Sequence, residues 1–168
     1  MSRFSNYVSI GCFAIAALAM VLMCAVVLAQ VIGRLFGILV PSAPEIAGYC
    51  MATSSFMALA YTFRNGGHVR VSLLLYQLSP KWRLWAETAC LTVASLLSVF
   101  FCAYLAQMTV ETYEVGEASS GVVAIPLVIP QAFLVFGAAA LSLVLIEALI
   151  VALRGRLPEY ASKAELGH

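Results

Sequence analysis

The chain has 168 residues, of which 63% are hydrophobic and 10% are charged, and its mean hydropathy is +1.00. So little polar surface cannot cover a soluble domain of this size, and the composition therefore predicts one small integral membrane domain over residues 1–168. A net charge of +1 without a dense basic run excludes a nucleic-acid-binding surface.

Four long stretches with almost no charge predict an all-α protein with four transmembrane helices, because about 18 apolar residues suffice to cross the hydrocarbon core. Only the second stretch is marginal in apolar length. The expected helices cover about residues 6–34, 43–64, 83–111 and 127–153. The first is about twice as long as the apolar region of a secretory signal, so it is read as an uncleaved helix.

The basic residues sort to one side of the membrane if each stretch crosses it once. With the N-terminus in the cytoplasm, eight of the nine Lys and Arg residues lie inside and only Arg34 lies outside. Because basic residues in short loops concentrate on the cytoplasmic side, the sequence predicts that the N and C termini are both cytoplasmic.

The second helix begins with a pattern typical of a capping box, Ser42-Ala-Pro-Glu45. Ser42 is expected to be the N-cap and Glu45 to reach back to the free backbone N–H groups. Arg34 lies at the outer end of the first helix, where a cation suits the negative end of the helix dipole. An ion pair between Glu45 and Arg34 across the loop is also expected. The alternative is that Glu45 contacts a partner subunit.

The linker between the second and third helices carries most of the inner basic residues. Gly66 and Gly67 allow a sharp turn, and the apolar segment 68–79 is too short to cross a bilayer. This segment predicts a short amphipathic helix in the inner interface, followed by interfacial tryptophans. The candidate partner or lipid-interface residues of this region are Arg64, His68, Arg70, Trp82, Arg83 and Trp85.

The third helix has no charge between Glu87 and Glu111, which favours a packing role over a transport pathway. The acidic loop that follows is interpreted as a solvated edge. Glu147 is the acidic residue well inside the fourth span, and an intramembrane carboxylate is a functional candidate. The structural interpretation is that Glu147 pairs with Arg83, Arg154 or a partner subunit near the inner interface.

Catalytic and cofactor chemistry has no sequence signal here. The five cysteines lie inside predicted spans without a Cys-x-x-Cys pair, and the two histidines are His68 in the inner loop and His168 at the end. No enzyme activity, cofactor or metal site is therefore expected, and a four-helix membrane oxidoreductase is disfavoured. A self-sufficient oligomeric exporter that uses Glu147 as its coupling carboxylate stays open as an alternative.

Several segments together resemble the small membrane subunit, the DctQ type, of tripartite ATP-independent periplasmic (TRAP) transporters. They are Glu45 at the start of the second helix, Met57-Ala-Leu-Ala60, the run from Arg64 to Leu75, and Leu78-Ser-Pro80. The Gly-His-Val-Arg-Val run is the most specific part. Ser72 stands where the family commonly has Asp, which removes one possible local salt bridge.

The resemblance implies a sodium-driven importer of organic acids in the bacterial cytoplasmic membrane. In such a system a periplasmic binding protein captures the substrate and docks transiently. A large elevator-type permease subunit carries the substrate and sodium sites. The small subunit would form a stable heterodimer with the large one, brace its scaffold within the membrane lipids, and bind neither substrate nor sodium.

Overall fold

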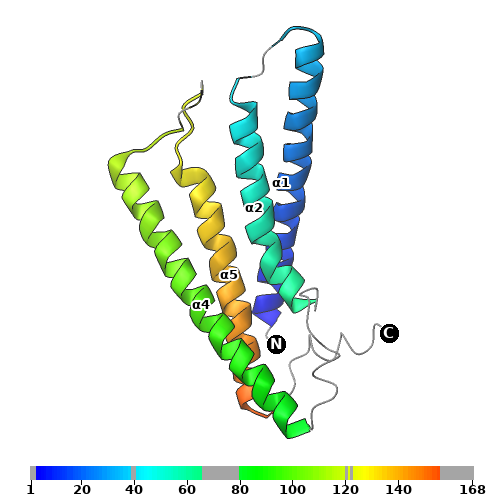
Figure 1. Ribbon diagram of the computed structural model, residues 1–168, viewed down its shortest axis with the longest axis vertical. Helices are drawn as coiled ribbons and strands as arrows, with labels where there is room; N and C mark the ends of the chain where they lie inside the picture. Colours follow the sequence, from blue (N-terminus) through cyan, green and yellow to red (C-terminus); the bar gives the residue numbers. More distant parts are fainter. Residues whose placement is uncertain (1–2, 39–40, 66–79, 120, 122, 156–168) are drawn as a thin grey trace.

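A computed structural model of the chain describes residues 3–38, 41–65, 80–119, 121 and 123–155. Within these ranges every regular element is a helix: α1 (Arg3–Leu35), α2 (Ala43–Arg64), α4 (Pro80–Val115) and α5 (Val128–Leu153) (Figure 1). The interfacial helix expected over residues 68–79 lies outside the described residues.

The third long helix, α4, is longer than the sequence analysis predicted. It begins at Pro80, three residues earlier than expected, because proline is well suited to the first turn of a helix. It ends at Val115, and Gly116 follows with φ +71°. The N–H groups of Gly116 and Glu117 both donate to the Thr112 carbonyl, at 3.1 and 3.2 Å, which closes the last turn.

The helices form two antiparallel hairpins, α1–α2 and α4–α5, which meet along α2 and α5 (Figure 1). The order of contact across the bundle is α1, α2, α5, α4, and α1 also touches α5. The first residues of α1 and the last residues of α5 lie at the same end of the bundle, the lower end in Figure 1.

Helix α5 occupies the centre because one side of it carries small side chains. Its buried residues include Gly137, Ala138, Ala140, Ser142, Ala148 and Ala152. Small residues let helix backbones approach closely, and polar side chains join helices within a membrane. A Cβ atom at Gly137 would lie 2.8 Å from the Phe56 backbone on α2. Toward α4, the Ser98 and Ser142 hydroxyls lie 2.7 Å apart and join α4 to α5.

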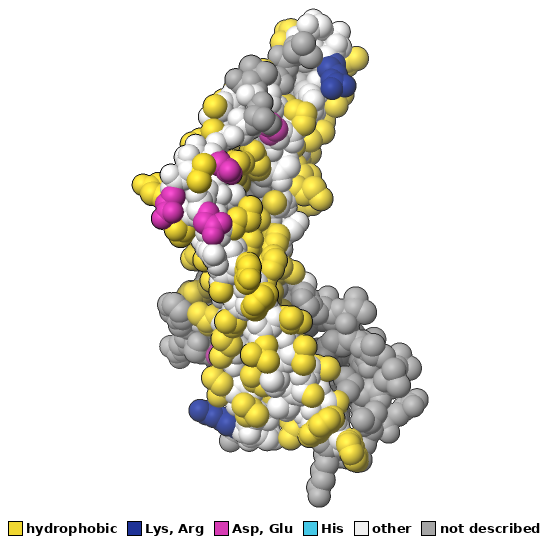
Figure 2. Space-filling view, turned by 60° about the vertical axis from the view of Figure 1, so that its left-hand side comes forward, with side chains coloured by type: hydrophobic (Ala, Val, Ile, Leu, Met, Phe, Trp, Pro, Cys, Tyr) yellow, Lys and Arg dark blue, Asp and Glu magenta, His cyan; other side chains and the backbone are white. Residues whose placement is uncertain are grey.

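Three of the described helices, α1, α4 and α5, are long and apolar enough to cross a membrane. The bundle buries 39% of the most apolar stretch of α5, but only 17% and 11% of those of α1 and α4. Hydrophobic side chains therefore cover the middle of the molecule, while acidic ones gather toward the upper end (Figure 2). The second helix, α2, has a higher proportion of Ser, Thr and Tyr than these three and is not among them.

Candidate functional site

The loop between α4 and α5, residues 116–127, folds back on itself at one end of the bundle. The Ser119 N–H donates to the Ile125 carbonyl at 2.9 Å, and the Leu127 N–H donates to the Glu117 carbonyl at 3.2 Å. An isolated bridge pairs Ala118 with Pro126. The loop therefore has a narrow base, and the described residues of its tip, 119, 121 and 123, lie toward the other hairpin.

The tip of this loop contacts the first turn of α2. The Ser119 hydroxyl donates a hydrogen bond to a carboxylate oxygen of Glu45, and the Val123 N–H donates to the Ser42 hydroxyl at 3.0 Å. The Gly121 N–H donates to the Ser119 hydroxyl at 3.2 Å. A Cβ atom on Gly121 would lie 2.6 Å from the Ser42 Oγ and would also collide with Glu45. We call these five residues the latch.

Ser42 is the N-cap residue of α2, as predicted, but the capping box expected there is wrong. Ser42 has φ 55° and ψ 12°, in the left-handed region, and its side chain makes no capping hydrogen bond. Its hydroxyl instead accepts from Val123, and the Glu45 carboxylate accepts from Ser119 instead of reaching back to the backbone. Arg34, the expected ion-pair partner of Glu45, is exposed at the end of α1.

At the opposite end of the bundle, Arg64 connects the end of α2 to the start of α1. Its guanidinium donates to the Ser5 hydroxyl at 3.1 Å. Ser5 and Ser9 are both fully buried, so the start of α1 carries a polar strip against the bundle. The Arg64 side chain is half-buried by this contact, whereas the sequence analysis placed it only at a lipid or partner interface.

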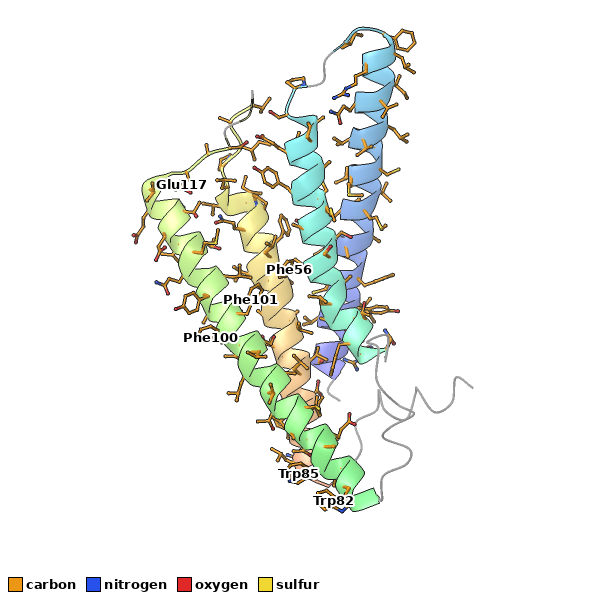
Figure 3. All side chains as sticks on the ribbon, in the orientation of Figure 1. Phe56, Trp82, Trp85, Phe100, Phe101 and Glu117 are labelled. Atoms are coloured by element: carbon orange, nitrogen blue, oxygen red, sulfur yellow. The ribbon has the colours of Figure 1, made fainter. Side chains whose placement is uncertain are left out.

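The predicted tryptophan pair lies at the start of α4. Trp82 and Trp85 are 63% and 68% exposed, and their rings meet edge to face with centroids 6.2 Å apart (Figure 3). Their exposure suits contact with lipid headgroups or with a partner. His68 and Arg70 lie outside the described residues, as does the side chain of Arg83.

Two carboxylates lie in the half of the bundle that holds the start of α1 and the end of α5. Glu147 is half-buried on α5. Glu87, on α4, is only 5% exposed and was not singled out from the sequence. Its position two residues after Trp85 predicts an interfacial side chain, and no sequence pattern distinguishes that from a buried one.

Three apolar grooves mark the surface of the helix layer. The first lies between α2 and α4 above α5, with a volume of about 500 Å³, and its lining includes Phe56, Phe63, Ala94, Ser98 and Phe101. Phe56 and Phe101 stack across it with ring centroids 5.9 Å apart (Figure 3). The second, about 300 Å³, lies among α1, α2 and the start of α5, and the third, about 510 Å³, lies between α4 and α5.

The chemistry of these grooves suits hydrocarbon or other helices. None of the three described grooves is lined by a charged side chain, and hydroxyl groups such as those of Ser98, Thr53 and Thr109 are their polar atoms. Among the described residues, no group of three or more His, Cys, Asp or Glu could hold a metal ion. The arrangement can pack against apolar partners, and its polar contacts join its own elements.

Comparison with known proteins gives one match. A family model described as the DctQ component of tripartite ATP-independent periplasmic transporters matches residues 23–155, which is more than half of the chain. The matched range contains all of α2, α4 and α5 and all five residues of the latch. Neither a curated protein nor a solved structure shows significant similarity to the chain.

Proposed function

Because the chain belongs to the DctQ family, the small permease component of TRAP transporters, we propose that it braces the large permease subunit of a sodium-coupled importer of organic acids. The large subunit, an elevator-type permease, binds the substrate and sodium. A periplasmic binding protein delivers the substrate and docks only transiently. The chain itself holds the stationary part of the permease in the bacterial cytoplasmic membrane.

The bracing role is supported by the contrast between the closely packed interior of the bundle and the uncovered apolar faces of its outer helices. Its interior is held by small-residue contacts, such as Gly137 against the Phe56 backbone, and by the Ser98–Ser142 hydroxyl pair. Its long outer helices, α1 and α4, leave most of their apolar surface uncovered. A thin layer of well-joined helices with broad apolar faces is suited to lie along a larger membrane protein.

We further propose that α2 is the fourth transmembrane segment, although it is less apolar than the other three. Its 22 residues span roughly 33 Å at about 1.5 Å per residue, against a hydrocarbon core of about 30 Å. It packs between α1 and α5, and its Ser, Thr and Tyr side chains are buried or half-buried except for that of Ser55. Four crossings with both termini in the cytoplasm agree with the charge distribution.

The proposal that this subunit binds no substrate rests on the groove linings. An organic acid carries a carboxylate, which needs cationic or multiple hydrogen-bonding partners when it leaves water. The three described grooves offer no cation. The described arginine side chains, Arg34, Arg64 and Arg154, all belong to the ends of helices.

Copurification tests this function. The chain is coexpressed with a large TRAP permease subunit from the same genome, a tag is placed on the large subunit, and the membranes are extracted in mild detergent. We expect the chain to copurify in a stable complex, and a tagged permease from an unrelated transport system serves as the control. Failure of the chain to copurify with its own permease would overturn the proposal.

A further inference from the structure

The two helical hairpins of this protein meet mainly along α2 and α5, and α1 adds a smaller contact with α5. Helix α2 packs against α5, and among the described residues the Phe56–Phe101 stack adds a contact between α2 and α4. Gly137 on α5 lies directly against the Phe56 backbone on α2, because it has no side chain to keep the two helices apart. All of these contacts lie between helices, so an attachment through the α4–α5 loop would hold the angle between the hairpins at one end of the bundle as well.

The latch supplies a second attachment, at the end of the bundle and away from the Gly137 contact. We propose that the Glu45 carboxylate and the Ser42 hydroxyl fasten the α4–α5 loop as a strap, and that this strap fixes the angle between the two hairpins. Fixing this angle also fixes the width of the groove between α2 and α4. This inference rests on the proposed bracing function, which would be the reason for a fixed angle. The strap itself involves only residues of this chain and can be tested without the permease.

The hydrogen bonds of the latch are suited to attach the α4–α5 loop to the start of α2. Hydrogen bonds to an ionised acceptor are about twice as strong as neutral ones, and the Glu45 carboxylate accepts one from Ser119. The second bond, from the Val123 N–H to the Ser42 hydroxyl, holds the loop backbone itself. Gly121 fits between the two acceptors only because it has no side chain.

The left-handed backbone at Ser42 is part of the same arrangement. A non-glycine residue with φ 55° is uncommon and is retained where the surroundings hold it. At this position Ser42 gives up the usual N-cap hydrogen bond and offers its hydroxyl to Val123. The start of α2 is thus shaped to receive the loop instead of to cap its own helix.

Hydrogen exchange on the full chain in lipid nanodiscs tests the fastening. In Glu45→Ala, the amides of the α4–α5 loop should exchange at least about tenfold faster, the ratio expected when one hydrogen bond to a charged acceptor is lost. Ser42→Ala and Ser119→Ala should act in the same direction, and Glu45→Gln, which keeps a neutral acceptor, should act less. Amides in the middle of α5 should not change, which reports that the bundle is still folded.

Glu117→Ala is the matched control, because it removes an exposed carboxylate from the same loop. It should leave the exchange rates at the wild-type value. Wild-type exchange in Glu45→Ala, or equal acceleration in Glu117→Ala, would overturn the proposal. If Glu45→Ala does not fold, Glu45→Gln and Ser119→Ala decide the question by the same criterion.

Spin-label distances test whether the strap sets the angle. Labels at Phe36 and Val115, both exposed at the latch end of their hairpins, should give a broader distance distribution in Glu45→Ala than in the wild type. Labels at Tyr7 on α1 and Leu153 on α5 should give the same distribution in both, because these two helices touch each other directly. Faster loop exchange with an unchanged Phe36–Val115 distribution would show that the loop does not control the angle. These measurements need no permease, so their failure is distinct from failed copurification.

Discussion

Glu147 is the residue at which bracing and self-sufficient export make opposite predictions. If the chain braces a separate permease, Glu147→Gln should leave uptake by the complete transporter within about twofold of wild type, because an isosteric change at a structural residue has a small effect. If Glu147 couples proton movement to export, the same variant should abolish transport while the protein still assembles. Radiolabelled uptake with the variant subunit decides between them, and Glu87→Gln is a matched control for removing one buried carboxylate.

The contact between Arg64 and Ser5 predicts a measurable coupling between the start of α1 and the end of α2. Arg64→Ala and Ser5→Ala should each lower the thermal stability of the bundle, because each removes one partner of a partly buried hydrogen bond. The double variant should be less destabilised than the sum of the two, by about 1 kcal/mol. Strict additivity in a double-mutant cycle would contradict the contact.

At the scale of elements, the close approach of α2 and α5 depends on Gly137. Gly137→Ala should destabilise the bundle by about 1 to 3 kcal/mol, because the new Cβ would lie 2.8 Å from the Phe56 backbone and the helices would have to separate. Gly48→Ala, on α2, is the control, since open space surrounds that position and alanine favours a helix. Thermal unfolding in detergent measures the stability of both variants. Equal effects of the two substitutions would show that the contact between α2 and α5 is not tightly packed.

Local sequence signals predicted the helices well and the contacts between them poorly. Helix α2 begins near the Ser42–Glu45 pattern and ends at Arg64, as predicted. The same Ser42–Glu45 spacing describes both a capping box and one side of the latch. What distinguishes the latch from a capping box is the hydrogen bond from Ser119 to Glu45. Ser119 is 74 positions away and reaches Glu45 only when α5 packs against α2. The grooves likewise depend on helix tilt, which composition does not encode.

At the scale of the whole molecule, the number of crossings depends on α2. If α2 crosses the membrane, single cysteines at Phe36 and Asn65 in a variant without the native cysteines should be labelled from opposite sides by a membrane-impermeant thiol reagent. We expect Phe36 to react in intact spheroplasts and Asn65 to react only after the membrane is opened. Labelling of both positions from the same side would reduce the protein to three crossings.

The central claim is that this chain supports transport without performing it. The most direct measurement is sodium-driven uptake into proteoliposomes of a carboxylate that the system's own periplasmic binding protein binds. We predict uptake when the large permease and this chain are reconstituted together with the binding protein, and no uptake with either membrane subunit alone. Uptake by this chain without the permease, or equal uptake by the permease without this chain, would contradict the account.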